Sequence, residues 1–346
     1  MNTIRVGVVG AGFWARYQIL AWQQIEGVEV RAITNRTLEK ANRLAADLGI
    51  PTVAATPEEL VNLDDVDVVD IITGESTHHE YTLLAARAGK HAITQKPMAE
   101  SFDDCREMVA ACEAAGVRLF VHDNWRFQTP VRTFLEWYRE RPVGAVRRAR
   151  FSYLSSFPVF EMQPALREAE RFMLMDMGTH IVDTTRAFVG DLAWVAAQTA
   201  ALTSGIAGED LATILAGTTA GTHAVIELSY ASPTEHEHEL ETLIQLECDD
   251  GVMQLDHDFR AVVTRRDGTS IGRRFAPIVH DWLIPRYTLS MGSCLPANES
   301  FVRALRTGKP SESDGHGYLN TMEAVFAAYR SAEDNRIVHL TTGGTS

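Results

Sequence analysis

The sequence predicts an α/β fold in which a doubly wound parallel sheet is followed by an α+β domain with a mostly antiparallel sheet. In the first third of the chain, short apolar runs alternate with helical patterns, which is typical of parallel βαβ units with helices on both faces. Farther on, strand-like runs follow one another and the helices stand apart, which favours an antiparallel sheet. Because 346 residues exceed what one hydrophobic core usually serves, we expect two domains, residues 1–123 and 124–346.

The elements of the first domain have recognisable ends. The first strand is an apolar run that ends at Gly10, and three helical patterns end at Gly49, Gly89 and Gly116. We expect strands at residues 4–9, 28–33, 67–72, 91–94 and 117–122, and helices at residues 13–25, 38–48, 79–88 and 102–115.

The second domain has a different order of elements. A helix at residues 131–139 stops before Pro142, and a long helix at residues 171–188 ends at Gly190. Asp-Gly pairs at 250–251 and 267–268 are hairpin-type turn signals. We expect strands at residues 146–154, 194–202, 211–216, 222–231, 242–248, 252–255 and 261–265, and further helices at residues 298–306 and 319–335.

Composition excludes several classes of partner. Asp and Glu number 46 against 32 Lys and Arg, so the formal net charge is −14, which disfavours nucleic acid and anionic membranes. No apolar run is long enough to span a bilayer, and no signal-like leader precedes the first strand, so we expect a cytoplasmic protein. Four cysteines without a C-x-x-C pair do not make a disulfide scaffold.

The N-terminal segment carries a glycine-rich turn between a strand and a helix. Residues 10–15, GAGFWA, fit G-x-G-x-x-A, in which Gly10 permits the tight turn and Gly12 lets the backbone approach a pyrophosphate. The pyrophosphate would lie at the helix N-terminus, where free N–H groups point outward. The motif predicts a Rossmann domain that binds a dinucleotide through Gly10, Gly12, Phe13 and Trp14.

The end of the second strand bears on the choice between NAD and NADP. An acidic residue there would bind the ribose hydroxyls and repel a 2′-phosphate, but this chain has Asn35 followed by Arg36. Arg36 could bind a 2′-phosphate or stack on adenine, and the alternative is a solvated loop charge. The pair favours NADP slightly over NAD.

Three residues are candidates for acid–base catalysis. Asp176 and His180 lie four apart in a helical pattern, so they share one face, which Asp183 extends. The alternative is a local Asp–His pair with a structural role, but Gly178 between them would let a ligand approach the helix closely. Lys96 follows a parallel strand at its carboxyl end, where open α/β sheets bind ligands.

Taken together, GAGFWA, Lys96-Pro97 after the fifth strand and D-x-G-x-H-x-x-D at 176–183 resemble the Gfo/Idh/MocA oxidoreductases. The resemblance covers nearly the whole chain. It implies a Rossmann domain, an α+β domain whose open sheet often makes the oligomer contact, and hence a homodimer or homotetramer. It also implies hydride transfer between NAD or NADP and a carbinol carbon of a sugar or polyol.

Two departures from the family pattern concern the cofactor side. The usual E-K-P is Gln95-Lys96-Pro97, and the usual T-P-x-x-x-H runs from Thr73 to His78 with glycine in place of proline. The resemblance places Thr73, His78, Gln95 and Lys96 near the cofactor. QKP at 95–97, VHDNWRFQ at 121–128 and QPALREAERF at 163–172 resemble the branch of the family that contains D-apiose dehydrogenase.

The resemblance also implies a mechanism. His180 would accept the hydroxyl proton, Lys96 would donate a hydrogen bond to the same oxygen or share the role of base, and Asp176 would orient substrate or imidazole. A neighbouring carboxylate raises the pKa of a lysine, whereas a neutral amide does not. With Gln95 beside it, Lys96 should lose its proton more easily than in an E-K-P relative.

Four further residues are candidates for substrate binding, each with a plainer alternative. Asn124, Trp125 and Arg126 follow the last strand of the first domain, where a substrate would lie at the domain junction. Trp125 could equally pack between domains and Arg126 form an ion pair. Arg171 precedes the catalytic helix face, and its alternative is a solvated charge.

The run EHEHE at 235–239 raises the question of a metal. In a strand, His236 and His238 would share a face, but the run follows Pro233 and no third ligand is suggested. An exposed, charged edge strand is the preferred interpretation, so we expect no metal site.

Two other functions fit the same residues. One is a glycosidase of the same family, which would oxidise its sugar transiently, cleave by elimination and recycle a tightly held NAD. The other is a non-catalytic sensor that binds nucleotide or sugar. Lys96, Asp176 and His180 together favour the dehydrogenase over the sensor.

Overall fold

The computed structural model describes residues 3–234 and 240–341. The chain forms two compact units. The first comprises the chain up to Asn124 with His280–Leu283 and Met291–Leu319, and the second comprises Trp125–Val279, Ile284–Ser290 and the chain from Asn320. The sequence prediction assigned everything after residue 123 to the second domain, whereas the structure packs two later segments with the first unit.

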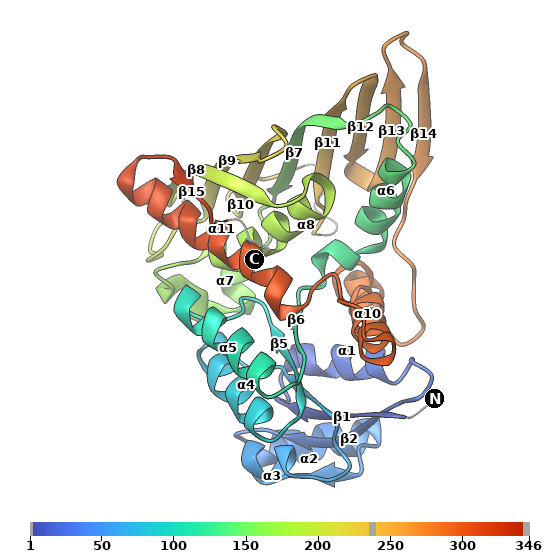
Figure 1. The fold of residues 1–346 in the computed structure, drawn as a ribbon, viewed down its shortest axis with the longest axis vertical. Helices are drawn as coiled ribbons and strands as arrows, with labels where there is room; N and C mark the ends of the chain where they lie inside the picture. Colours follow the sequence, from blue (N-terminus) through green and yellow to red (C-terminus); the bar gives the residue numbers. More distant parts are fainter. Residues whose placement is uncertain (1–2, 235–239, 342–346) are drawn as a thin grey trace. The chain divides into compact units, whose positions relative to one another are not determined.

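The first unit is built on a six-stranded parallel sheet with the strand order β3-β2-β1-β4-β5-β6. The order reverses direction beside β1, as in doubly wound sheets, so this part of the predicted fold class is confirmed. The strands are β1 (Ile4–Val9), β2 (Val28–Thr34), β3 (Thr52–Val53), β4 (Val68–Ile71), β5 (His91–Gln95) and β6 (Leu119–His122). The helices that accompany them in Figure 1 are α1 (Phe13–Trp22), α2 (Leu38–Leu48), α3 (Pro57–Val61), α4 (His78–Arg87) and α5 (Phe102–Ala114).

Two short elements of this unit were not expected from the sequence. Strand β3 has only two residues, and α3 has five, so neither spans enough chain to show a period. Helix α3 begins where Thr56 accepts a hydrogen bond from the Glu59 backbone N–H at 3.2 Å, with Pro57 in the first turn. The first helix also ends earlier than predicted, at Trp22 instead of residue 25.

A helix from late in the chain completes the core of the first unit. Helix α10 (Cys294–Thr307) packs on α1 (Figure 1), and its Phe301 ring stacks on Phe120 of β6 with centroids 5.0 Å apart. Both rings are fully buried in one cluster with Ile19 and Trp22 of α1. Apolar burial, which follows no order along the sequence, explains why this segment belongs with the first unit.

The second unit contains a nine-stranded sheet with the order β14-β13-β12-β11-β7-β10-β9-β8-β15. Among the described strands of this second sheet, only β7 and β10 pair in parallel, so the prediction of a mostly antiparallel sheet is confirmed. The strands are β7 (Val146–Leu154), β8 (Leu192–Ala200), β9 (Leu211–Thr218), β10 (His223–Ser229), β11 (Leu243–Cys248), β12 (Gly251–Asp256), β13 (Arg260–Arg265), β14 (Ser270–Arg274) and β15 (Val338–His339).

The helices of this part of the chain are short apart from the last one. They are α6 (Thr129–Arg139), α7 (Val159–Met162), α8 (Thr179–Val189), α9 (Thr288–Gly292) and α11 (Gly315–Asp334), which runs from the first unit into the second. The helix predicted for residues 171–188 begins two residues later, at residue 173, and its first part, Leu174–Gly178, is a π-helical turn that leads directly into α8. Strand β14 was also missed, and all five of its residues are exposed, so it lacks the alternation that marks a half-buried strand.

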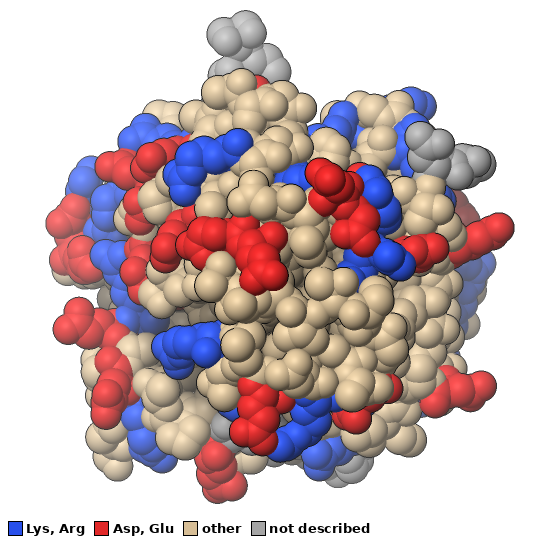
Figure 2. Space-filling view, turned by 90° about the horizontal axis from the view of Figure 1, so that it is seen from below, with Lys and Arg blue, Asp and Glu red and all other residues tan. Residues whose placement is uncertain are grey.

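The structure also shows the surface charge and the hydropathy of the helices: one face carries charges of both signs (Figure 2). On the face drawn in Figure 2, basic side chains lie among acidic ones and do not form a continuous basic field. In the part of the chain that the structure describes, no helix combines the length and the apolar character needed to cross a bilayer.

Phe301→Ala should destabilise the first unit strongly, because it removes a fully buried ring from the cluster that joins α10 to the sheet. We expect the free energy of unfolding to fall by about 3–5 kcal/mol, measured by urea denaturation. Arg303→Ala, an exposed change on the same helix, is the control and should cost almost nothing. Equal effects of the two substitutions would contradict the assignment of α10 to this core.

Candidate functional site

The glycine turn between β1 and α1 is shaped for close approach to backbone. Gly10 has φ +122°, and a Cβ at this position would lie 2.1 Å from the Ile72 carbonyl oxygen, so only glycine fits. Gly12 is the N-cap of α1, has no side-chain cap, and a Cβ there would meet open space. The first turn of α1 therefore presents uncapped N–H groups beside an open position, as a bound pyrophosphate requires.

The two aromatic residues of this turn differ in environment. The Phe13 side chain is 56% exposed, and its ring contacts Tyr17 edge to face. Trp14 is half-buried, and its indole N–H donates to Gln18 Oε1 at 3.1 Å. That Phe13 and Trp14 contact the cofactor stays a prediction.

Asn35 supports the glycine turn. Its Oδ1 accepts a hydrogen bond from the Ala11 backbone N–H at 3.0 Å, and its Nδ2 donates to the Thr37 carbonyl oxygen at 3.0 Å. Arg36 beside it is exposed. An exposed guanidinium beside this turn could bind a 2′-phosphate. The preference for NADP over NAD stays a prediction.

The ends of β4 and β5 are joined by His78. Its imidazole is buried, with Nδ1 2.9 Å from the Pro97 carbonyl oxygen and Nε2 3.2 Å from the Thr73 carbonyl oxygen. Burial lowers the pKa of His78, so the ring is neutral at neutral pH and donates to one of the two carbonyls. His78 is therefore a buried residue that links two loops, although it stands at the start of a helix.

Lys96 follows β5 directly. Its side chain is half-buried, and its peptide bond to Pro97 is cis. Gln95, the last residue of β5, donates from Nε2 to Gln18 Oε1 at 2.8 Å. The four residues predicted on the cofactor side after β4 and β5 therefore lie at the carboxyl ends of neighbouring parallel strands, namely Thr73, His78, Gln95 and Lys96.

Asp176 and His180 occupy the π turn and the first turn of α8. The Tyr230 hydroxyl donates to Asp176 Oδ2 at 2.8 Å, and burial next to this carboxylate raises the pKa of Tyr230 well above its usual value. His180 is buried, and its ring stacks on Trp125 with centroids 4.5 Å apart and an interplanar angle of 25°. The Trp125 indole N–H in turn donates to Thr242 Oγ1 at 2.8 Å. Thr242 therefore fixes the Trp125 ring, and the Trp125 ring fixes the plane of the His180 imidazole.

The backbone of this helix start is held by a buried carboxylate. Glu209 accepts from the Leu174 backbone N–H at 3.0 Å, from the Phe172 N–H at 3.3 Å and from the Tyr329 hydroxyl at 2.7 Å. A carboxylate at a helix N-terminus stabilises the free N–H groups there. Glu209 therefore fixes the turn that carries Asp176.

Gly178 lies against apolar side chains of two elements. A Cβ at this position would lie 3.4 Å from side-chain atoms of Leu174 and Leu228, which is ordinary contact distance. The neighbours of Gly178 are thus apolar side chains of the protein, and a close approach of a ligand here stays a prediction.

The four residues predicted to bind substrate all have partners within the protein. Arg126 is buried and forms a bidentate ion pair with Asp183, with Nη2 2.7 Å from Oδ1. Asn124 Nδ2 donates to Ser293 Oγ at 2.7 Å. Arg171 lies over the rings of Phe326 and Tyr329. For Arg126 the structure matches the ion-pair alternative, and substrate contacts of Asn124, Trp125 and Arg171 stay predictions.

Three functional candidates were not found from the sequence. Tyr230 follows β10, and Gln18 and Asp70 lie on α1 and β4; all three contact predicted site residues or their neighbours. Tyr230 is far in sequence from Asp176, and Gln18 and Asp70 are far from each other and from Gln95; none forms part of a recognisable motif. The one available signal was an aspartate inside the apolar run DVVDII, where a charge must find buried partners.

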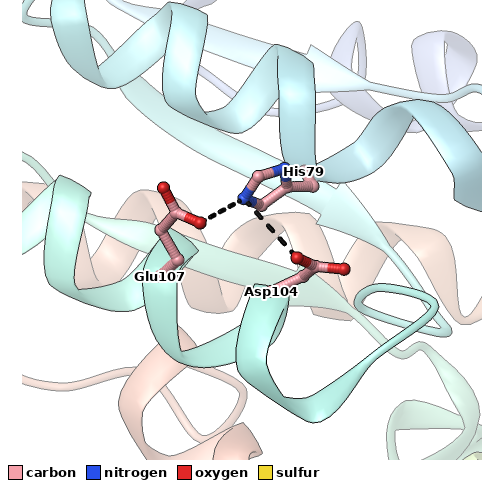
Figure 3. A group of neighbouring side chains, drawn as sticks. All are labelled: His79, Asp104 and Glu107. Atoms are coloured by element: carbon pink, nitrogen blue, oxygen red, sulfur yellow. Dashed lines mark hydrogen bonds and ion pairs between the residues drawn. The ribbon is translucent and has the colours of Figure 1, made fainter.

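A separate cluster joins α4 to α5 (Figure 3). His79 Nε2 lies 3.0 Å from Glu107 Oε2 and 4.0 Å from Asp104 Oδ1. The Ser101 hydroxyl donates to Asp104, which belongs to the start of α5. These contacts describe an ion-pair cluster between two helices. The run EHEHE at 235–239, for which the sequence raised the question of a metal, lies outside the described residues.

Comparison with known proteins gives matches over both units. The model of an oxidoreductase family with an NAD-binding Rossmann fold matches residues 4–123, and that of the GFO/IDH/MocA C-terminal domain matches residues 131–253. The chain is 35% identical to D-apiose dehydrogenase of Paraburkholderia graminis over 96% of its own length and 88% of that protein. It is 32% identical to D-apiose dehydrogenase of Rhizobium rhizogenes over 98% of both.

Solved structures agree with these matches. An oxidoreductase from Agrobacterium radiobacter, in complex with NAD+, L-tartaric acid and magnesium, has a TM-score of 0.94 at 32% identity and 98% coverage of both chains. A levoglucosan dehydrogenase in complex with NADH and levoglucosan has a TM-score of 0.84 at 19% identity, which shows a shared fold. The family resemblance and the NAD(P)-binding Rossmann fold predicted from the sequence are confirmed.

Gly10→Ala should abolish dinucleotide binding, because the added methyl group collides with the Ile72 carbonyl in a backbone conformation that alanine avoids. We expect the Kd for NAD and NADP, measured by isothermal titration calorimetry, to rise at least about a hundredfold. Gly89→Ala is the matched control, because Gly89 also has positive φ (+68°) but open space around its Cβ position. Loss of binding in the control alone, or in neither, would contradict this role of Gly10.

Proposed function

We propose, since the chain belongs to the GFO/IDH/MocA oxidoreductase family, that it is an NAD(P)-dependent dehydrogenase which oxidises a carbinol carbon of a sugar. The observation that carries the proposal is the likeness along nearly the whole chain to two curated proteins that share one name, D-apiose dehydrogenase. Apiose, a branched pentose, is therefore the first substrate to test.

The cofactor side of the proposal rests on the glycine turn. Its uncapped helix start and the space at Gly12 fit a pyrophosphate. The bound nicotinamide supplies the hydride acceptor. Gln95 fits a role on this side because it ends β5, and Thr73 because it follows β4 closely. His78 fits it because its ring contacts the Thr73 and Pro97 carbonyl oxygens.

In this proposal His180 is the base. It accepts the proton of the substrate hydroxyl as the hydride leaves the carbon, so that the carbinol becomes a carbonyl. Stacking on Trp125 fixes the plane of the imidazole and therefore the direction from which its nitrogens meet the hydroxyl. The burial of His180 limits competition by water.

Lys96 and Asp176 complete the proposed catalytic set. The Lys96 ammonium donates a hydrogen bond to the substrate oxygen and stabilises the negative charge that develops on it. Asp176 accepts hydrogen bonds and orients substrate or imidazole, while the Tyr230 hydroxyl holds one of its oxygens. These roles use residues that the sequence motif D-x-G-x-H and Lys96-Pro97 already single out.

A homo-oligomer, as dimer or tetramer, also belongs to this proposal. Leu215 in β9 and Ile271 in β14 each expose 45% of their surface on the sheet of the second unit. Apolar side chains on an exposed sheet favour contact with a second copy. Light scattering of the purified protein measures the oligomer size, and the cytoplasmic location stays a prediction from the sequence.

The test of the function is reduction of the cofactor. Purified protein is mixed with NAD or NADP and a panel of aldoses and polyols that includes apiose, and the absorbance of the reduced nicotinamide is followed. Reduction with a narrow set of sugars supports the dehydrogenase and identifies the preferred cofactor. Cofactor binding without reduction by any sugar contradicts it, and release of an aglycone without added cofactor would indicate the glycosidase instead.

Lys96→Ala should lose most of the catalytic rate and keep the cofactor. We expect kcat to fall by about 10²–10⁴-fold, because a positioned donor to the reacting oxygen is removed, while the Kd for the dinucleotide changes little. Lys40→Ala, which removes an exposed lysine on α2, is the control. Near-wild-type turnover of the Lys96 variant would refute its assignment.

Tyr230→Phe should reduce kcat without unfolding the protein, because it removes one hydrogen-bond donor from Asp176 and leaves the ring packing. The expected fall is about tenfold, in line with one hydrogen bond to a charged group. Tyr138→Phe is the matched control, since its hydroxyl contacts Arg141 and no proposed site residue. The same loss of kcat in both variants would show that Tyr230 has no special role.

A further inference from the structure

A carboxylate that has no cationic partner among the described residues lies inside the first unit. Asp70 of β4 is fully buried, and its neighbours in register are Val8 of β1 and Ile93 of β5. It accepts hydrogen bonds from neutral donors: Gln18 Nε2 lies 2.8 Å from both carboxylate oxygens, and Trp22 Nε1 lies 2.7 Å from Oδ2. Burial of a carboxylate costs folding free energy unless its oxygens accept hydrogen bonds, so Asp70 depends on these donors and holds them in place.

These contacts fix the orientation of Gln18. An ionised carboxylate only accepts hydrogen bonds, so the amide nitrogen of Gln18 must face Asp70 and its oxygen must face away. The indole of Trp14 confirms this independently, because an indole N–H only donates and it lies 3.1 Å from Gln18 Oε1. Two groups of fixed polarity thus set the direction of one buried amide.

The same polarity passes to Gln95. Gln18 Oε1 accepts from Gln95 Nε2 at 2.8 Å, so the nitrogen of the Gln95 amide faces inward. This is the one hydrogen bond that the Gln95 side chain makes among the described residues. Its oxygen is consequently the group that this half-buried residue, next to Lys96, offers to a ligand.

We infer that Asp70 is a positioning residue, which acts through Gln18 to hold the Gln95 amide so that its oxygen accepts a hydrogen bond from the bound dinucleotide. The inference rests on the proposed function for the placement of the dinucleotide, while the coupling of the three side chains stands on their contacts alone. Asp70 itself does not touch the ligand. It determines which end of the Gln95 amide faces outward.

The chain of contacts also explains why position 95 is an amide. A glutamate at 95 would place a carboxylate against Gln18 Oε1, and two acceptors repel each other. Gln18 cannot reverse to accommodate it, because its oxygen would then face the Asp70 carboxylate. Carboxylates at positions 70 and 95 are therefore incompatible while Gln18 lies between them.

The titration of Asp70 makes the stability of the protein depend on pH, which can be measured without any ligand. Burial raises the pKa of Asp70 to about 7, against the opposing effect of its donors. Gln18 and Trp22 of α1 do not titrate, Val8 and Ile93 are apolar, and the Cys294 thiol of α10 has a pKa raised by burial and then by Asp70. Because the folded state binds this proton more tightly than the unfolded chain, Asp70 lowers stability progressively as pH rises from about 4 to about 7.

The test is a double-mutant cycle of Asp70→Asn and Gln95→Glu, with Gln24→Glu as an exposed control for the added charge. In the double variant, the new amide at position 70 can accept from Trp22 and donate to a reversed Gln18, whose nitrogen then faces the new carboxylate at position 95, while Trp14 loses its contact with Gln18 Oε1. In Asp70→Asn alone, Trp14 still favours the present direction of Gln18 but the new amide can oppose it, so the direction of the Gln95 amide is no longer fixed. The measurements are the Kd for NAD and NADP by calorimetry at pH 8, where Asp70 is ionised, and the midpoint of urea unfolding without cofactor at pH 5 and pH 8.

We expect each single variant to bind the dinucleotide about tenfold more weakly, and the double variant to recover to within about threefold of the wild type. Asp70→Asn should also remove a fall in the unfolding midpoint between pH 5 and pH 8. Effects that multiply in the double variant would overturn the coupling, and so would a double variant that fails to fold. If Gln95→Glu alone does not fold, recovery of folded protein in the double variant supports it. The unfolding cycle needs no substrate, so failure of the sugar assay would refute only the proposed function.

Discussion

The parallel register of the first sheet is the constraint on which the cofactor side of the site depends. Val9 of β1 is level with Ile71 of β4, which is level with Thr94 of β5, so all three strands end at one edge. The residues that follow are the ones with chemical roles in the proposal, from the glycine turn to Lys96. A shift of one residue in any of these strands would turn its last side chain to the other face of the sheet.

The direction of the Gln95 amide at this edge of the sheet is set by a buried residue of the sheet, Asp70. Asp70 lies in β4, and Ile72, whose carbonyl oxygen lies against Gly10, follows the end of this strand. One short segment therefore contacts the glycine turn and, through Gln18, the amide at position 95. Backbone packing fixes the turn, and hydrogen bonds through Gln18 fix the amide. The second unit uses the same device, because Tyr230 and Glu209 hold Asp176 and its helix start from other elements. In both units, residues with no motif of their own orient those with one.

This division explains what the sequence could predict. The glycine turn, Lys96-Pro97 and the Asp176–His180 spacing are local patterns, and the alternation of apolar runs predicts the parallel sheet. Tyr230, Gln18 and the partner of Arg126 could not be found, because contacts between residues tens of positions apart leave no periodic signal. The π turn at Leu174–Gly178 was missed because its residues suit an ordinary helix, and Glu209, which accepts from the Leu174 N–H, comes 35 residues after that leucine. Strand β14 was missed because nothing along it is buried.

The departure at Gln95 has two consequences, and they act together. A neutral amide beside Lys96 carries no charge, where the usual glutamate would carry one. The same amide is the group that Gln18 and Asp70 require, because a carboxylate would meet an acceptor. A change at position 95 that restores the usual glutamate therefore alters the charge beside Lys96 and the polarity of the buried contacts at once. The electrostatic effect on Lys96 can be isolated only where position 70 has been changed as well, because Asp70 otherwise keeps Gln18 turned against the new carboxylate.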